Sequence, residues 1–347
     1  MTENAHPVNP PTPIKASNVA RTESELKQVA DMHHITTPRR SLLSDAWFRL
    51  IRNKASLVSM VIIVVFFLIA IFANVLAPVN PLELHSGKGL LPPVFVKIGP
   101  TGDAPDPRFL LGTDTLGRDV LSRTIYGTRV SMVVGFVPLV IIMIIGVILG
   151  LVSGYAGGTV DNLLMRFTDV VYAFPELLFF IIVMIALRET WIGQLFNGLF
   201  LVFGALALIS WTGVARIVRG SVLSLKEKEF IEAARCIGAR DSRIMFGHIL
   251  PNCLSPLIIT AAFAIPGFII YEATLGFLGL GMVPSSNPAD IFITSWGSLM
   301  NEGQSAINAQ PWLLLSPAIF ISLVVMAFTF VGDGLRDALD PRLQGTQ

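Results

Sequence analysis

The stretch Leu57–Ala77, LVSMVIIVVFFLIAIFANVLA, decides how the rest of the chain can fold. It runs for 21 residues without a charged side chain. About 20 apolar residues in a helix are enough to cross the hydrocarbon core of a bilayer, which is about 30 Å thick. The stretch therefore predicts a membrane-spanning helix.

Five further segments are long and apolar enough to span a membrane. They are Val130–Val152, Val170–Leu187, Leu195–Ala215, Leu257–Leu280 and Trp312–Val331. The segment 170–187 contains Glu176 and the segment 257–280 contains Glu272, while the others are uncharged. Only 14% of the 347 residues are charged and 53% are hydrophobic, whereas a soluble domain carries about 25% charged residues. Long uncharged runs repeated four times argue against a large soluble core. The sequence predicts an all-α integral membrane protein with six transmembrane helices.

The basic residues predict the orientation of these spans. If the N-terminus is cytoplasmic, the inside segments hold 18 Lys and Arg residues and the outside segments hold 7. Cytoplasmic loops carry an excess of Lys and Arg, so both termini are expected in the cytoplasm. Cys236 and Cys253 are the two cysteines and form no metal-ligand or disulfide pattern, which favours a reducing compartment.

The segments outside the spans are assigned as follows. Residues 1–40 are polar and proline-rich, which predicts a flexible cytoplasmic tail, and no secretory signal peptide is expected because the first apolar run starts only near residue 57. Residues 41–56 predict an amphipathic helix in the membrane interface, or alternatively an extension of the first span. Its apolar face consists of Leu43, Trp47, Leu50 and Ile51, and its polar face of Asp45, Arg49 and Arg52. The six-span body is 57–343, and 344–347 form a short tail.

A glycine ladder extends the second span. Gly146, Gly150, Gly154 and Gly158 follow one another at intervals of four residues. Small residues at this spacing let two helices approach closely in lipid. The ladder predicts tight helix packing.

The external segment 78–129 contains a dense polar motif. It runs from Leu111 to Asp119, and its candidate gating or docking residues are Gly112, Thr113, Asp114, Gly117, Arg118 and Asp119. Thr113 or Asp114 could cap a helix that leads into the second span. A gating or docking surface and a charged turn held by its own ion pairs explain the motif equally well.

The cytoplasmic loop 216–256 has the composition of two short helices joined by a bend. The first helix should end at Gly238, since glycine stops a helix at low cost. The second should begin at Asp241 and end before Pro251. The small side chains of Ala233 and Ala234 would leave room for another protein to lie close. We therefore interpret this loop as a docking surface rather than a solvated hairpin.

At this loop the sequence resembles a known family. Glu232, Ala233 and Ala234, then Gly238, then Leu250 and Pro251 resemble the EAA motif of ABC-importer permeases. His248 stands where the general pattern has an apolar residue, and the run 248–252, HILPN, is similar to the peptide-importer branch.

Other segments agree with that branch. They are Leu111–Asp119, Gly154–Gly158, Phe277–Gly281, Trp296–Gly297 and Gly332–Arg342. The resemblance covers about residues 41–343 and is to the C-type permease subunit of oligopeptide and dipeptide importers. It implies the type I ABC-importer permease fold.

The resemblance also implies the partners. They are a second related permease, one or two cytoplasmic ABC ATPase subunits, an external substrate-binding protein and membrane lipid, but no nucleic acid. No G-x-x-x-x-G-K-[ST] sequence occurs, so ATP and Mg would be used by the partner ATPases and no cofactor by this chain. Glu232, Ala233, Ala234, Gly238, Leu250 and Pro251 would couple to the ATPase. No catalytic residue and no metal ligand is assigned.

Two alternatives stay open at this stage. An ion-coupled secondary transporter could use Glu176 and Glu272, because carboxylates inside spans are costly and often functional. Glu272 is accordingly the pore candidate. Alternatively, the same ABC architecture could import nickel, a nickel chelate or another small solute.

Overall fold

The computed structural model describes residues 42–97, 99 and 102–339. The chain divides into two compact units, Met1–Asp45 and Ala46–Gln347. The first unit contributes only the start of one helix to the described residues, and the helical bundle belongs wholly to the second. The predicted tails 1–40 and 344–347 lie outside the described residues.

The described part of the chain is mostly helical, with long irregular segments between α4 and α5 and between α13 and α14. Its helices are α2 (Leu42–Arg52), α3 (Lys54–Ile71), α4 (Ala73–Leu76), α5 (Val120–Ala156), α6 (Gly158–Tyr172), α7 (Glu176–Leu187), α8 (Trp191–Gln194), η1 (Leu195–Gly198), α9 (Leu199–Leu225), α10 (Glu229–Cys236), α11 (Asp241–Ile244), the π-helical turn η2 (Met245–Ile249), α12 (Leu250–Asn252), α13 (Leu254–Phe277), α14 (Trp296–Ser305) and α15 (Trp312–Leu339). Across residues 42–97, 99 and 102–339 the β-structure is limited to one isolated bridge, between Thr113 and Asp119.

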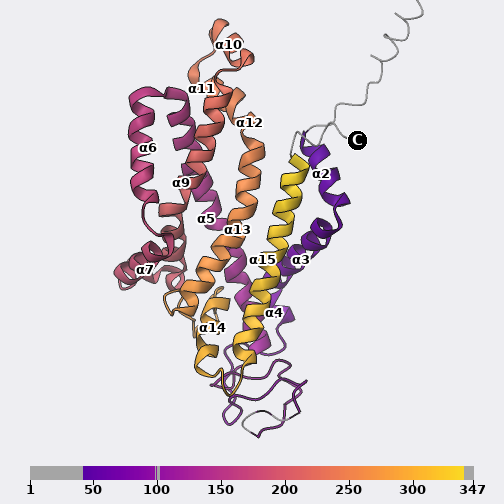
Figure 1. Ribbon diagram of the computed structural model, residues 1–347. Helices are drawn as coiled ribbons and strands as arrows, with labels where there is room; N and C mark the ends of the chain where they lie inside the picture. Colours follow the sequence, from indigo (N-terminus) through magenta and orange to yellow (C-terminus); the bar gives the residue numbers. More distant parts are fainter. Residues whose placement is uncertain (1–41, 98, 100–101, 340–347) are drawn as a thin grey trace, which may run out of the picture. The chain divides into compact units, whose positions relative to one another are not determined.

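The long helices pack side by side, with short helices at both ends of the bundle (Figure 1). Helices α10, α11 and α12 form one end, which we call the α10 end, and α14 lies at the opposite α14 end. The beginning of α3 and the last turns of α15 meet at the α10 end, where the Ser56 hydroxyl donates to the carbonyl of Phe330 at 3.2 Å. The termini of the spanning region thus lie on the same side as α10, which agrees with an even number of spans.

Among the described residues, five helices are long and apolar enough to cross a membrane, and a sixth span is possible if α6 and α7 count as one broken span. Those two helices meet at 78°. The predicted span Val170–Leu187 is therefore not one continuous helix, because a break at 173–175 divides it between the end of α6 and α7. Pro175 separates the two helices because it has no backbone N–H to donate and disfavours a helical conformation in the residue before it. Glu176 consequently begins α7 instead of lying inside a span.

The glycine ladder brings α5 and α9 into close contact. A Cβ on Gly150 would lie 2.6 Å from the carbonyl oxygen of Ala215, and one on Gly146 would lie 2.6 Å from Cβ of Val214. Gly154 meets Val222 in the same way. Gly158 lies beyond the break at Gly157 and has no neighbour within 4 Å, so the prediction fails for this fourth glycine. The two helices therefore form one rigid pair.

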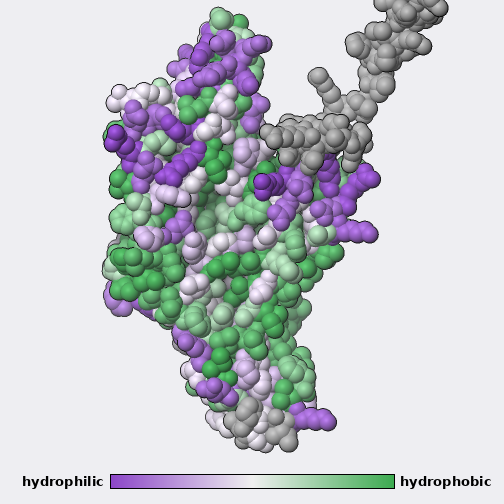
Figure 2. Space-filling view, in the orientation of Figure 1, coloured by the Kyte–Doolittle hydropathy of each residue, from purple (hydrophilic) through white to green (hydrophobic). Residues whose placement is uncertain are grey.

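The surface has an apolar band between two polar ends (Figure 2). Helix α3 shows why: its outward residues are large and aliphatic, and Val58, Val61 and Val64 are each more than half exposed. Hydrophilic residues gather over α10 and α11 (Figure 2). On α2, Leu50 of the predicted apolar face is buried, whereas Trp47 and Ile51 of the same face are 55% and 38% exposed, and a place in the membrane interface stays a prediction. The side chains of Leu43 and Asp45 lie outside the described residues.

Candidate functional site

The first candidate site is the segment 226–253, which we call the coupling segment. Its first helix, α10, ends where Gly238 adopts a φ of +77°. A side chain with Cβ rarely adopts this left-handed conformation, so glycine is the residue that can stop the helix here at low cost. The predicted helix, its end and the bend that follows are confirmed.

One face of α10 is packed and the other is open. Ile231 and Ala234 are buried and belong to the main apolar core. Ala234 therefore does not offer its small side chain to a partner, contrary to the sequence prediction, because a helix turns it to the same side as Ile231. Ala233 and Glu232 are exposed and remain available.

Two exposed residues of this face were missed in the sequence. Phe230 is 44% exposed, and Ile237 is 85% exposed. Together with Ala233 they follow the i, i+3, i+7 spacing of one helix face. That spacing was visible in the sequence, but the prediction relied on the EAA residues and so named Ala233 and Ala234 instead. Exposed apolar side chains along one helix face favour a docking surface over a hairpin exposed to water.

The coupling segment is tied to the ends of two long helices. Tyr155, the last residue but one of α5, donates its hydroxyl hydrogen to Asp241 of α11 at 2.5 Å. The guanidinium of Arg235 lies 5.6 Å from the centre of the same tyrosine ring. Lys226, directly after α9, donates to the carbonyl of Gly154 at 3.3 Å. A force on α10 or α11 therefore reaches both α5 and α9.

The second half of the segment differs from the prediction. Helical structure does not stop before Pro251 but continues through α11, η2 and α12, up to Asn252. Pro251 is tolerated because it stands in the first turn of α12, where its missing N–H is not required, directly after the wider π-helical turn. Pro251 is exposed and Leu250 half-buried. The loop is also shorter than predicted, since α9 extends to Leu225.

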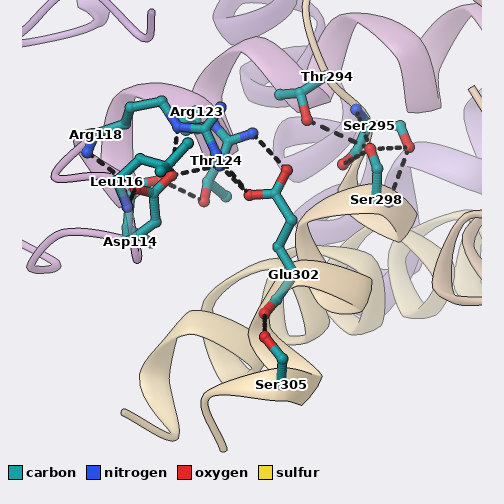
Figure 3. A network of polar contacts seen from close by, with 11 residues as sticks. Asp114, Leu116, Arg118, Arg123, Thr124, Thr294, Ser295, Ser298, Glu302 and Ser305 are labelled. Atoms are coloured by element: carbon teal, nitrogen blue, oxygen red, sulfur yellow. Dashed lines mark hydrogen bonds and ion pairs between the residues drawn. The ribbon is translucent and has the colours of Figure 1, made fainter. Parts of the chain in front are cut away.

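The second candidate site lies at the α14 end and is a cluster of four charged residues (Figure 3). Asp114 accepts from Arg118 at 2.6 Å and from Arg123 at 2.7 Å. Both arginines also donate to Glu302 of α14, Arg118 at 2.9 Å and Arg123 with both terminal nitrogens. Asp114 and Arg123 are 1% and 2% exposed. The cluster joins the turn before α5 to a helix about 180 residues later in the chain.

The remaining motif residues hold this turn in place. Gly112 and Gly117 have φ values of +76° and +78°, and a Cβ on either would lie within 2.3 Å of a backbone oxygen, that of Leu91 or His85. The Thr113 side chain accepts from the amide of Leu91 at 2.9 Å. Of the two interpretations of the motif, the geometry matches the charged turn held by ion pairs, and a docking or gating role stays a prediction.

Asp119 caps the start of α5. Its carboxylate accepts from the amide of Ser122 at 2.8 Å and from its hydroxyl at 2.6 Å. Burial raises the pKa of Asp119 above its ordinary value, against the opposing effect of the hydrogen bonds from Ser122. A buried cap of this kind fixes where α5 begins.

The two carboxylates considered for a pore have different surroundings. Glu272 of α13 is completely buried, so the prediction that it faces the protein interior is confirmed. Neither of its carboxylate oxygens has a partner at good hydrogen-bond geometry among the described residues, and the Ser295 side chain is a nearby polar group that interacts with it. Glu176 instead accepts from the hydroxyl of Tyr271 at 2.5 Å. A pore role for Glu272 stays a prediction.

Comparison with known proteins identifies the family. Residues 146–345 match the model of the binding-protein-dependent transport system inner membrane component. The chain belongs to this family. Residues 41–93 match the N-terminal transmembrane domain of oligopeptide transport permease C, which confirms the resemblance seen in the sequence. The type I permease fold and the multi-pass membrane character are those of the family.

Individual relatives match this chain over nearly its whole length. This chain is 40% identical to the oligopeptide transport system permease protein OppC of Haemophilus influenzae, and the match covers 91% of this chain and 94% of that protein. It is 38% identical to OppC of Bacillus subtilis, over 93% and 97% of the two chains. The dipeptide transport system permease protein DppC of Haemophilus influenzae is 36% identical, over 89% and 98%.

Proposed function

We propose that this chain is the C-type, pore-forming subunit of an ATP-driven importer that moves oligopeptides or dipeptides into a bacterial cytoplasm. The observation that carries the proposal is the similarity along nearly the full length of both chains to permeases named for oligopeptide and dipeptide transport. The match of residues 41–93 to a domain named for oligopeptide permease C supports the same cargo.

The proposed orientation has both termini and the coupling segment in the cytoplasm. The basic residues support it, since the segments predicted to be cytoplasmic from the sequence carry 18 of the 25 Lys and Arg residues. The external segment 78–129 and the segment 282–311 with α14 would then face outward. The chain would lie in the cytoplasmic membrane.

The energy for transport would come from partner subunits. The chain has no P-loop sequence, so ATP and Mg would bind to one or two ATPase subunits docked on the coupling segment. A second permease would complete the pore, and an external binding protein would deliver the peptide. This chain would carry out no covalent chemistry.

The contacts of the coupling segment supply a mechanism for coupling. ATPase closure would push the exposed face of Phe230, Ala233 and Ile237. Because Ile231 and Ala234 are packed in the core, α10 would move with the bundle instead of sliding over it. Tyr155 and Lys226 would pass the motion to α5 and α9, which the glycine ladder holds together. The pair would then tilt as one body and open or close the pore.

Reconstitution tests the proposal. The complete transporter in proteoliposomes should take up labelled di- or oligopeptide only with ATP and with the external binding protein present. Reporters fused after Gln347 and within 216–256 should report the cytoplasm, and one within 284–309 the outside. Uptake that follows a proton gradient without ATP, or uptake of a nickel chelate but no peptide, would contradict it.

A further inference from the structure

An apolar groove runs between α3 and α5 near the α14 end. Its volume is about 640 Å³, which is the size of ordinary ligand pockets. Nine of its eleven lining residues are apolar, among them Phe67, Met132, Phe136 and Val137. The two polar residues are Asn74 and Arg129. The groove therefore has an apolar body and a single charge.

Arg129 has no carboxylate partner within the part of the chain that the structure describes. Its guanidinium donates to three neutral acceptors instead. They are the carbonyl of Ala70 at 2.8 Å, the side-chain oxygen of Asn74 at 3.0 Å and the carbonyl of Ile291 at 3.5 Å. A guanidinium has five N–H donors. The guanidinium also lies 4.9 Å from the centre of the Tyr126 ring. Since neither the ring nor the three acceptors carries a negative charge, the charge of Arg129 and part of its donor capacity remain available to an anion.

The depth of Arg129 in the bundle is known from its neighbours. It is the last charged residue before the uncharged run 130–152 of α5, and it contacts the last turn of α3. Arg129 therefore lies at the boundary between the apolar band and the polar end. Phe136 lies seven residues further along α5, about 10 Å deeper into the apolar band.

We propose that this groove binds one glycerophospholipid, with its phosphate at Arg129 and an acyl chain along Phe67, Phe136 and Val137. A phosphate supplies the negative charge that Arg129 lacks, and arginine binds phosphate with strong, charge-assisted hydrogen bonds. An acyl chain can cover the apolar wall because it has no polar group that would need a hydrogen-bond partner there. A helix of a partner protein in the same groove would set apolar side chains against an unpaired cation, which is costly.

Photo-cross-linking in the complete transporter tests the proposal. Val137, 40% exposed in the groove, is replaced by p-benzoylphenylalanine. Ile148, 48% exposed on the same helix but outside the groove, serves as the matched position. The complex is extracted, washed in detergent to remove loosely held lipid, irradiated, and weighed intact. Position 137 should gain the mass of one phospholipid, and position 148 should not.

Substitutions at the charge test the recognition itself. Arg129→Gln should lower the lipid adduct at position 137 about tenfold, as expected for loss of a charge-assisted hydrogen bond. Arg129→Lys should retain most of it, and Arg188→Gln, an arginine outside the groove, should leave it unchanged. A polypeptide adduct at position 137 of the otherwise unchanged chain would show that a partner helix fills the groove and would overturn the proposal. A lipid adduct equally strong with Arg129→Gln would do the same.

Discussion

Tyr155 and Asp241, joined by a 2.5 Å hydrogen bond, connect the end of the longest span to the coupling segment. Tyr155 belongs to α5, which packs along α9 through three glycines, while Asp241 opens the helix that follows the Gly238 bend. This one contact ties the proposed docking surface to the spanning helices α5 and α9.

Tyr155→Phe should weaken coupling without preventing assembly. The ring keeps its place under Arg235, but the hydrogen bond to Asp241 is lost. A net hydrogen bond to a charged group contributes about 1.5–3 kcal/mol. We expect less peptide transported per ATP hydrolysed, measured in proteoliposomes. Asp241→Asn keeps an acceptor for the hydroxyl and should be closer to the original ratio. An unchanged ratio in Tyr155→Phe would show that this contact does not transmit force.

Gly150→Ala should destabilise the chain through the contact between α5 and α9. Its Cβ would lie 2.6 Å from the carbonyl of Ala215, and overpacking of this kind costs about 1–3 kcal/mol. The matched control is Gly220→Ala in α9, where a Cβ meets nothing within 4 Å. The midpoint temperature of thermal unfolding in detergent should fall for Gly150→Ala and should stay unchanged or rise for Gly220→Ala. Equal midpoints would mean that the two helices are not packed as closely as described.

Arg123→Met should prevent the α14 end from folding correctly. Asp114, 1% exposed, would keep Arg118 but lose its ion pair with the equally buried Arg123, and breaking a buried ion pair costs about 3–5 kcal/mol. We expect a loss of protein from the membrane and protease sensitivity in the segment 78–119. Arg108→Gln breaks an exposed pair with Asp106 and should have little effect. Normal yield of Arg123→Met would indicate that the cluster is dispensable.

Glu272→Leu should make the chain more stable and transport slower. The carboxylate is fully buried, and among the described residues only the Ser295 side chain interacts with it, short of good hydrogen-bond geometry. Such a group is costly unless another state gives it a better partner. Glu272→Gln should have a stability and a transport rate between those of the unchanged chain and of Glu272→Leu. The measurements are the unfolding midpoint and peptide uptake. A fully active Glu272→Leu variant would remove Glu272 from any pore role.

Local patterns in the sequence predicted most of the helices and the bend at the coupling segment. Uncharged length located the spans, and Gly238 marked a helix end because few other residues tolerate its φ of +77°. Pro175 was visible too, but a hydropathy count does not register a proline that divides an apolar run.

The candidate sites were less predictable because they depend on packing between distant segments. The partners of Arg118 and Arg123 include Glu302, about 180 residues away, and no local pattern pairs them. The same limit applies to Ala234, whose burial depends on which side of α10 packs against the core. For Ile237 the spacing was present, but its exposure becomes evident only with the fold.

The central claim is that α10 docks an ATPase subunit and passes its motion to the spans. Gly238→Leu and Glu232→Lys change this surface without an internal clash, since Glu232 is exposed and a Cβ at Gly238 meets nothing within 4 Å. The leucine variant strains a backbone at φ +77° and alters the angle at which α10 is presented. Gly247→Ala, in the same segment and with no close neighbour, is the matched control.

The most direct measurement is paired: ATPase retained on the purified complex, and peptide uptake per ATP hydrolysed in proteoliposomes, for Gly238→Leu beside Gly247→Ala. We expect that Gly238→Leu remains inserted and folded but loses ATPase retention, coupling or both, about ten- to a hundredfold, while Gly247→Ala keeps both. Unaltered retention and coupling in Gly238→Leu would contradict the claim.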